Sequence, residues 1–269
     1  MKRLAAGAAL MVTMTACATI STQQEVELGR QYAAQINAQL PIVQDPEINR
    51  YINVLGDSIA EVSDDRNLDW HFFVVDSKEV NAFAVPGGYV YVNRGLIERS
   101  DKLDELAGVL GHEIGHVTHR HSVKLMEKQQ AANVGVSLGC ILMRVCESQA
   151  TGALINVAGG AIFAKFSREA EMEADESGVT YVTRAGIDPR GMPEMFQKLI
   201  AERGARPAGV EAWFATHPLE EDRVADTQAM IDKIDPLILQ SLSRDTPNFH
   251  EFKKRVQALP PSPEPKQAS

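Results

Sequence analysis

Hydrophobic side chains recur at helical spacing in two stretches near the beginning of the chain. The first stretch runs from Glu25 to Leu40, and the second begins at Pro46 and continues to about Val62. Apolar residues three or four positions apart line one face of a helix, and proline is favoured at the first helical position. The pattern therefore predicts two helices that pack against a core.

Between residues 69 and 92 the pattern changes to short runs rich in β-forming residues. Residues 69–76 form one run, and residues 81–85 and 89–92 flank the turn-forming sequence Pro86-Gly87-Gly88. These features predict one strand, followed by two strands joined by a turn. The strand at 81–85 is either a plain sheet edge or an edge whose unpaired backbone groups bind an extended peptide.

Helical spacing returns after residue 100 and dominates the rest of the chain. Ser100 is expected to cap a helix that runs through His116, and Ser167 to cap another that ends at Gly186. Further helices are expected at residues 188–203 and 216–234, with one or two more after residue 235. The chain should therefore fold as a predominantly helical α+β protein with one small sheet.

The interval from Ala131 to Phe166 is apolar but contains polar and charged residues, among them Arg144 and Glu147. A membrane-spanning helix needs about 20 predominantly apolar residues, and no stretch here reaches that length. We expect two helices rich in small residues that pack beside the rest of the domain. A hairpin resting on a membrane is the alternative.

The first residues have the features of a bacterial export signal. Lys2 and Arg3 precede an apolar run that is too short to span a bilayer. Residues 14–17, Met-Thr-Ala-Cys, resemble a lipobox in which Cys17 becomes lipidated; an ordinary cleavage site across residues 16–18 is the alternative. Because Ala18 is not aspartate, the resemblance to lipoprotein sorting signals implies an anchor in the outer membrane, facing the periplasm.

These observations divide the chain into four parts. They are a signal peptide at residues 1–16, a tether at 17–24, a main domain at 25–235, and a C-terminal tail at 236–269 that is partly helical and ends in a disordered, proline-rich segment.

The composition is that of an acidic globular protein. The chain has 269 residues, with 27 basic and 36 acidic side chains, a formal net charge of -9 and 44% hydrophobic residues. No basic stripe is present, which argues against nucleic-acid binding. Cys140 and Cys146 either form a disulfide, which would require a break in any helix between them, or remain separate thiols.

The candidate chemistry lies at the end of the helix that begins near residue 100. His112 and His116 are four positions apart, and Glu113 directly follows the first histidine. Four helical residues advance about 400° and roughly 6 Å, so both imidazoles face the same way and can bind one ion. Glu113 lies about 100° around the axis, where it can act as a base on a water beside the metal. A zinc peptidase requires this arrangement.

A third ligand is expected from the acidic helix after Ser167. Glu171 and Asp175 are one turn apart on one face. A carboxylate ligand followed by a second carboxylate suits zinc and a partner that orients a ligand histidine. The alternatives are a solvated acidic face for this helix and coordination by His119, for which a surface or orienting role is favoured.

Several segments together resemble one family of gluzincin metallopeptidases, which includes the CAAX prenyl endopeptidases, the membrane peptidase HtpX and soluble periplasmic members. The segments are residues 81–84 (Asn-Ala-Phe-Ala), 88–92 (Gly-Tyr-Val-Tyr-Val), 112–116 (His-Glu-Ile-Gly-His), 167–168 (Ser-Arg) and 171–175 (Glu-Met-Glu-Ala-Asp). The similarity covers about residues 25–235 and is closest to the soluble periplasmic members. It implies a zincin-like domain in which the edge strand borders the active site.

The resemblance implies a zinc endopeptidase with one Zn²⁺ per chain. His112, His116 and Glu171 would bind the zinc, Glu113 would be the catalytic base, and Asp175 would support the site. The substrate-binding residues would be Asn81, Ala82, Phe83 and Ala84.

A His-Pro…Arg element lies near the metal in this family, and the resemblance gives it a role here. His217 and Arg223 are candidates for gating the site and for stabilising the oxyanion. In periplasmic relatives the histidine can cover the zinc as a fourth, self-inhibiting ligand. The alternative is that His217 merely precedes the start of a helix and has no role in the site.

The expected substrates are unfolded or misfolded envelope proteins, because pairing with an edge strand uses backbone groups that folded proteins do not offer. The expected attachment to the membrane is the lipid on Cys17. The main alternative is a lipoprotein chaperone or assembly factor that contains zinc and keeps the protease site capped. A further alternative is a structural zinc site closed by His217.

Overall fold

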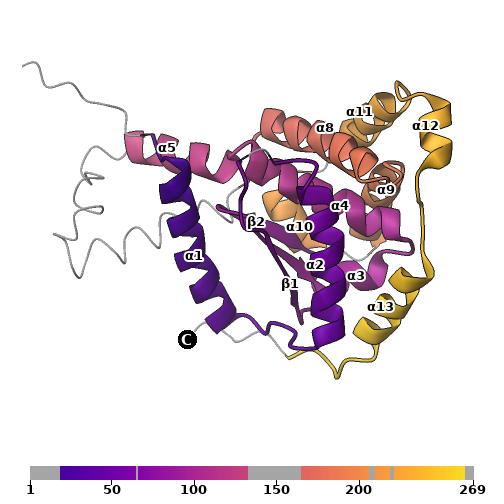
Figure 1. Cartoon of the computed structure of the whole chain (residues 1–269), viewed down its shortest axis with the longest axis horizontal. Coiled ribbons are helices and arrows are strands. Elements are labelled where there is room, and N and C mark those ends of the chain that lie inside the picture. Colours follow the sequence, from indigo (N-terminus) through magenta and orange to yellow (C-terminus); the bar gives the residue numbers. More distant parts are fainter. Residues whose placement is uncertain (1–18, 65, 133–164, 206–209, 219–220, 264–269) are drawn as a thin grey trace, which may run out of the picture.

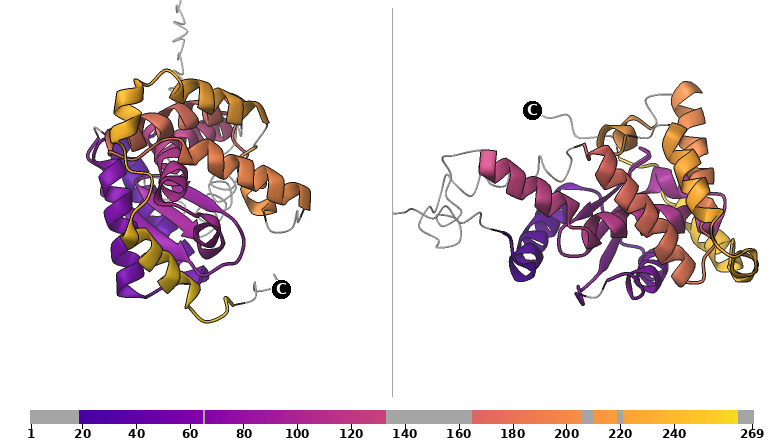
Figure 2. Two further views of the ribbon diagram at one scale, coloured as in Figure 1. Left: turned by 90° about the vertical axis from the view of Figure 1, so that its right-hand side faces the viewer. Right: turned by 90° about the horizontal axis from the view of Figure 1, so that it is seen from above.

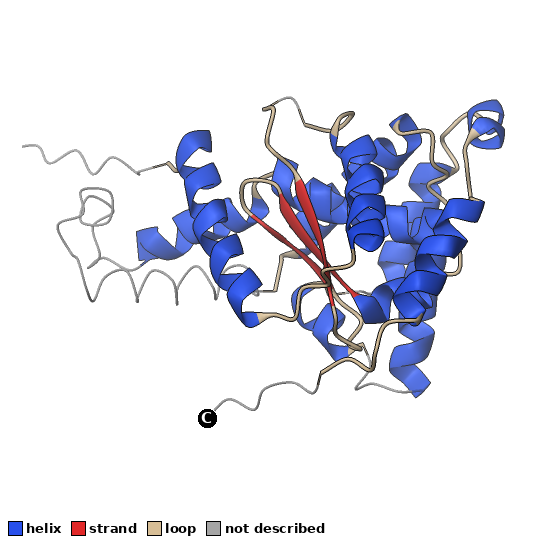
Figure 3. Ribbon diagram, turned by 60° about the horizontal axis from the view of Figure 1, so that its bottom comes forward, coloured by secondary structure: helices blue, strands red, loops and turns tan. Residues whose placement is uncertain are grey.

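The computed structural model describes residues 19–64, 66–132, 165–205, 210–218 and 221–263. The elements are α1 (Thr22–Gln39), α2 (Pro46–Ala60), β1 (His71–Val75), β2 (Ala82–Val85), β3 (Tyr89–Asn93), α3 (Arg94–Arg99), α4 (Leu103–Thr118), α5 (His121–Ala132), α8 (Arg168–Arg184), α9 (Gly191–Ala205), α10 (Glu211–Thr216), α11 (Glu221–Ile231), α12 (Pro236–Ser241) and α13 (Pro247–Gln257). Helices surround a small sheet, which confirms the predicted α+β class (Figures 1 and 3).

Three predictions concern residues outside the described ranges. Cys17 and the signal peptide precede residue 19, and Cys140 and Cys146 fall between residues 133 and 164. Lipidation, the disulfide and the small-residue helices therefore stay predictions.

Strand β3 is the centre of the sheet. It pairs in parallel with β1, which aligns His71 with Tyr89, and antiparallel with β2, which aligns Ala82 with Val92. The turn between β2 and β3 passes through Gly87 and Gly88, whose φ angles of 82° and 98° lie in the region that glycine tolerates. The strand order β1-β3-β2 makes β2 an edge strand, as predicted.

The sheet separates two hydrophobic clusters, because successive side chains point to opposite faces of a strand. On one face, side chains such as Phe72 and Val90 belong to the larger cluster, which also contains residues of α2, α4 and α9. On the other face, Phe83 and Tyr91 join residues of α1 and α5. Helix α4 therefore lies in the main core of the molecule, on one side of the sheet.

Helix α4 packs closely along α8, and glycines permit this approach. A Cβ atom at Gly111 would lie 2.9 Å from the Val182 side chain, and one at Gly115 would lie 3.0 Å from the Ala174 carbonyl oxygen. Larger residues at these positions would push the helices apart. The close packing sets the beginning of α8 beside the end of α4 (Figure 1).

The predicted Ser100 cap is wrong. Ser100 ends α3, a helix that was not predicted, and its hydroxyl donates to the Leu96 carbonyl at 3.1 Å. Helix α4 begins at Leu103, whose N–H donates to the Asp245 carboxylate at 3.3 Å. The capping group comes from a distant segment, so the local sequence could not reveal it.

The predicted ends of α8 are confirmed. The Ser167 hydroxyl accepts a hydrogen bond from the Ala170 N–H at 3.3 Å. Gly186, with φ 79°, follows the last turn, where a left-handed residue ends a helix.

The C-terminal helices lie against the same core. Phe249, Phe252 and Val256 of α13 are buried in the larger cluster, and the Tyr51 and Phe252 rings stack with centroids 4.3 Å apart. Helices α1 and α5 lie at one end of the molecule, and α11 and α12 lie at the other (Figures 1 and 2). Among the described residues, every helix is too short or too polar to cross a bilayer.

Candidate metal centre

The histidine pair and its glutamate lie on the last two turns of α4, in the interior of the molecule. His112, Glu113 and His116 each expose 2% of their surface or less. Their burial follows from the apolar residues of α4, which fix the helix between the sheet and α8. The motif therefore lies on a helix, as predicted.

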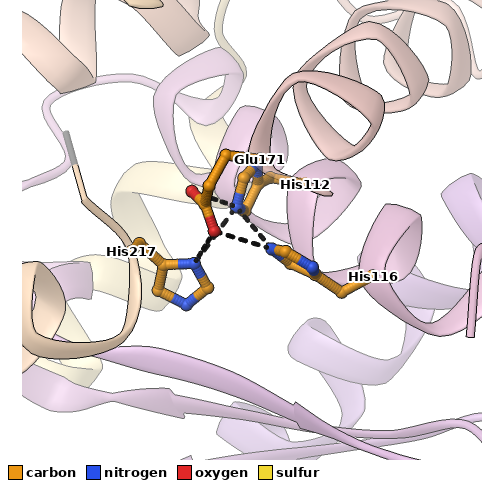
Figure 4. A group of neighbouring side chains, drawn as sticks. All are labelled: His112, His116, Glu171 and His217. Carbon is orange, nitrogen blue, oxygen red and sulfur yellow. Dashed lines mark hydrogen bonds and ion pairs between the residues drawn. The ribbon is translucent and has the colours of Figure 1, made fainter. Parts of the chain in front are cut away.

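Four side chains converge at this point (Figure 4). The Nε2 atoms of His112 and His116 are 3.0 Å apart. Glu171 Oε1 lies 3.5 Å from His116 Nε2, and Glu171 Oε2 lies 3.7 Å from His112 Nε2. His217 Nδ1 lies 3.3 Å from His112 Nε2. One nitrogen or oxygen atom from each residue lies within 4.8 Å of the others, so the four could hold one metal ion.

Asp175 sets the orientation of His112. Its Oδ1 lies 2.8 Å from His112 Nδ1, and a carboxylate can only accept, so the imidazole nitrogen donates. The proton on Nδ1 leaves the Nε2 lone pair of His112 directed at the centre. Histidine ligands of metals are commonly held by a carboxylate in this way.

Arg223 forms ion pairs with both acidic residues of α8 in the site. Its Nε and Nη2 donate to the two oxygens of Asp175 at 2.8 and 2.7 Å, and its Nη1 lies 2.5 Å from Glu171 Oε2. Burial alone would raise the pKa of Glu171, but the charge of His217 and the hydrogen bond from His116 hold that pKa far below its usual range. Glu171 is therefore an ionised carboxylate, the form that binds metal.

Glu113 lies beside the cluster. Burial is the largest influence on this carboxyl group and raises its pKa. Its Oε1 is buried and accepts no hydrogen bond among the described residues, and it lies 3.4 Å from His217 Nε2. A buried carboxylate with a free oxygen and a raised pKa has the properties of a general base.

His217 occupies the remaining side of the cluster. It follows α10 directly, and its ring lies 4.7 Å from the Trp213 ring. Burial would lower the pKa of His217, but the carboxylates of Glu113 and Glu171 outweigh burial and raise it. The His217 side chain is 1% exposed, so the centre is closed to solvent in this structure.

The donor set fits a metal ion. Two imidazole nitrogens and a carboxylate are the groups that zinc prefers, and burial holds the pKa of His116 well below its usual value, which keeps that ring neutral. The Nε2 atoms of His112 and His116 face each other although each ring has another partner on its Nδ1 atom. Imidazole nitrogens that converge in this way are typical of ligands around an ion.

The predicted substrate strand adjoins the cluster. The Asn93 N–H donates to the Asn81 carbonyl, so these two residues form a hydrogen-bonded pair of the antiparallel ladder. Because such pairs alternate along a strand, the backbone groups of Ala82 and Ala84 point away from β3. The Ala84 N–H is a hydrogen-bond donor to the Glu113 carboxylate. Residues 82–84 are buried in this structure, with Ala84 8% exposed.

Three contacts of the centre were not predicted. His121 Nδ1 lies 2.8 Å from His116 Nδ1, and the Phe166 ring stacks on His116 with centroids 4.0 Å apart. Trp213 packs against both His112 and His217. The only sequence signal was the position of His121 shortly after the motif, and five residues along a helix would have placed it on a different face.

A model of peptidase family M48 matches residues 44–231 of the chain. The beta-barrel assembly-enhancing protease of Escherichia coli K12 is 36% identical over 238 residues, which are 84% of this chain and 48% of that protein. The metalloprotease YcaL of the same organism is 32% identical over 153 residues, which are 57% of this chain and 59% of YcaL. The mitochondrial metalloendopeptidase OMA1 of Schizosaccharomyces pombe is 29% identical over 174 residues, which are 65% of this chain and 50% of OMA1. This chain thus spans about half the length of the assembly-enhancing protease.

Proposed function

Because this chain belongs to peptidase family M48, we propose that it is a zinc-dependent endopeptidase that cleaves unfolded or misfolded proteins of the bacterial envelope. The observation that carries the proposal is the convergence of His112, His116 and Glu171, with Glu113 beside them. The family match supports a metal at this cluster, and zinc is the ion that the donor set favours.

The zinc ion would be held by His112, His116 and Glu171. When bound, it would supply a Lewis acid that polarises the substrate carbonyl and lowers the pKa of a water. Asp175 would keep the His112 ring in the tautomer that presents Nε2, and Arg223 would hold Asp175 and Glu171 in place. We therefore propose a positioning role for Arg223, because all three of its guanidinium nitrogens are already engaged.

Glu113 would be the catalytic base. It would take the proton of the attacking water and deliver it to the leaving amine, which requires a carboxylate that is close to the cluster but does not bind the metal. The buried, unbonded Oε1 atom supports this role.

An extended substrate would pair antiparallel with β2. The backbone groups of Ala82 and the Ala84 carbonyl point away from β3, and such groups recognise peptides without regard to side chains, whereas the Ala84 N–H is held by Glu113. The burial of this strand implies that the site must open before a substrate enters.

His217 would control that opening. It contacts Glu113 and Glu171, so it would have to move away before a substrate carbonyl could approach these two groups. In the open form its imidazole would be free to stabilise the oxyanion, which requires a donor close to the metal.

The periplasm, with an anchor through Cys17 in the outer membrane, is the proposed location. The export signal in the sequence supports it. The relative named for enhancing β-barrel assembly supports substrates among outer-membrane proteins. The second candidate function, a chaperone with a capped site, is favoured by one observation, the closure of the cluster by His217.

The decisive variant is Glu113→Gln in the zinc-loaded protein. We expect zinc content to stay at the wild-type level, because Glu113 is not among the proposed ligands, and cleavage of casein to fall by at least about 10²-fold, the contribution of a general base. Zinc content is measured by elemental analysis and cleavage by release of labelled peptides. Undiminished cleavage would reject the mechanism.

His217→Ala is the companion variant. Faster casein cleavage than wild type supports gating by His217, and slower cleavage supports an oxyanion role. For the capped chaperone, Glu113→Gln and wild type would be equally active in cells, and neither protein would cleave casein.

A further inference from the structure

A second group of metal-binding side chains lies at the junction of α4 and α5, outside the centre described above. It consists of His119, His121 and Glu173, each of which offers one atom within 4.8 Å of the other two. None of the three belongs to the proposed zinc ligands, and the proposed reaction uses none of them.

A sharp turn of the backbone builds this cluster. Arg120, between the two histidines, has φ 58°, in the left-handed region, which brings the His119 and His121 rings into a stack with centroids 5.4 Å apart. The Arg120 Nε donates to the buried Glu25 carboxylate at 2.7 Å. Because α1 holds the turn through this ion pair, the two rings are positioned in advance of any ligand.

The donor atoms have the spacing of ligands around one ion. Glu173 Oε2, from α8, lies 3.0 Å from His121 Nε2 and 3.7 Å from His119 Nδ1. Two ligands of a tetrahedral zinc site, each about 2.1 Å from the metal, are about 3.4 Å apart. Small rotations of the Glu173 side chain would therefore make room for an ion.

The other nitrogen of each ring has its own partner. His119 Nε2 lies 2.7 Å from the Ser177 hydroxyl, and His121 Nδ1 lies 2.8 Å from His116 Nδ1. These contacts fix the rings with His119 Nδ1 and His121 Nε2 directed at Glu173. Histidine ligands of metals generally donate a hydrogen bond from the nitrogen that faces away from the ion, as His119 Nε2 can do to Ser177. The contact between His121 and His116 has room for one proton between its two Nδ1 atoms, so with an ion at both centres the two rings would share that proton, and the second proton would be released to solvent.

Solvent reaches this cluster directly. The side chains of Glu173 and His119 are 51% and 36% exposed. His119 also lines a cavity of about 530 Å³ together with residues such as Asp64 and Tyr181. An ion can enter here without any opening of the molecule, and water can complete its coordination.

We propose that His119, His121 and Glu173 bind a second divalent metal ion, with Zn²⁺ as the preferred one. Two imidazoles and one carboxylate favour zinc over the hard ions Ca²⁺ and Mg²⁺, which prefer oxygen ligands. We call this second ion the outer ion, and the centre at His112, His116 and Glu171 the inner centre. The contact between His121 and His116 would link a ligand of the outer ion to a ligand of the inner centre.

The experiment counts Zn²⁺ bound by the purified full chain, without a polyhistidine tag, after removal of all metal with a chelator. Equilibrium dialysis followed by elemental analysis gives the equivalents bound. Wild type should bind two equivalents of Zn²⁺. Both Glu173→Gln and His119→Gln should lower the affinity for the outer ion at least tenfold and leave the affinity for the inner ion unchanged. A hundredfold excess of Ca²⁺ should not displace the outer ion.

His250→Gln is the matched control. Its Nε2 lies 2.6 Å from Asp245, so it forms a similar histidine–carboxylate pair, but at a site where the described residues offer no third donor. This variant should bind two equivalents. Because Glu173 and His119 are partly exposed, their variants are expected to fold, and circular dichroism of each sample checks this.

A further variant, His112→Asn, separates this proposal from the proposed function. It should lose the inner equivalent and keep the outer one. The outer site is rejected if Glu173→Gln binds as much zinc as wild type, or if wild type binds one equivalent that His112→Asn abolishes. If wild type instead binds one equivalent that only Glu173→Gln abolishes, the outer site stands and the zinc peptidase assignment fails.

Discussion

At the scale of single residues, the centre depends on a balance of buried charges. The carboxylates of Glu171 and Asp175 lie in the interior, and an unpaired buried carboxylate costs several kcal/mol. Arg223 contacts both of them and also lies over the Phe196 ring, 5.0 Å from its centroid. The charged groups therefore stabilise one another, and each one fixes the position of the next.

Asp104 gives a prediction about pH, because burial raises its pKa from the ordinary 3.8 to about 6. Its Oδ1 accepts no hydrogen bond among the described residues. A raised pKa means that the stabilisation from the protonated form is complete below about pH 3.8 and is lost as the pH rises through about 6. Asn cannot titrate. Relative to Asp104→Asn, wild type should lose about 2 kcal/mol of unfolding free energy between pH 4 and pH 7.5.

Urea unfolding of both proteins across this range, in the presence of a chelator, measures the difference. A constant difference between the two pH profiles would contradict the raised pKa.

The site residues differ in how far the sequence could predict them. His112, Glu113 and His116 depend only on helical spacing, and Glu171 on the acidic helix that follows Ser167. His121 could not be found in this way, because its contact with His116 requires the left-handed backbone at Arg120. Only the packed structure shows that conformation.

At the scale of elements, the centre depends on the close packing of α4 against α8. Glycines on both helices face each other, and Gly178 lies within 3.1 Å of the His112 amide nitrogen, measured from the position of an added Cβ. The helix that carries Glu171 can therefore reach the helix that carries the histidines. Sequence spacing predicts each helix, but not the distance between them.

Gly115→Ala tests this dependence. The new methyl group would lie 3.0 Å from the Ala174 carbonyl oxygen and 3.1 Å from the Ala174 Cα, which requires the helices to separate. Overpacking of this kind costs about 1–3 kcal/mol, and a shift of Glu171 should weaken zinc binding at least tenfold. The affinity is measured by competition with a chromophoric chelator.

Gly204→Ala is the control, because no atom of the described part of the chain lies within 4 Å of the added methyl group near the end of α9. It should leave zinc affinity unchanged and raise stability by about 0.5–1 kcal/mol. Equal zinc affinities for the two variants would show that helix separation does not control the site.

The element boundaries show the same limit of prediction. The hairpin of β2 and β3 follows from local turn chemistry and was predicted. The parallel pairing of β1 with β3 was not predicted, because it joins strands that are not adjacent in sequence. The cap of α4 likewise comes from Asp245, more than 140 residues away.

At the scale of the whole molecule, the C-terminal segment belongs to the packed structure. Arg94, at the start of α3, donates to the carbonyl oxygens of Leu259 and Pro260, and the Ser262 hydroxyl bonds to Asp76. These contacts join residues after α13 to the region of the sheet. The chain after residue 235 therefore supports the core that contains α4.

Phe249→Ala tests this contribution. Phe249 is 0% exposed in the main core, and its truncation should lower the free energy of unfolding by about 3–5 kcal/mol. Leu237→Ala removes a side chain of the same region that is 73% exposed, and it should change stability by no more than about 0.5 kcal/mol. Urea unfolding compares the two, and similar losses would show that α13 does not stabilise the core.

The most direct test of the central claim is anomalous diffraction at the zinc absorption edge from crystals of the zinc-loaded protein. We predict a zinc peak about 2.0–2.2 Å from the Nε2 atoms of His112 and His116 and from a carboxylate oxygen of Glu171. A map with no zinc at this position, or with zinc bound there while Glu171 lies out of reach, would contradict the account.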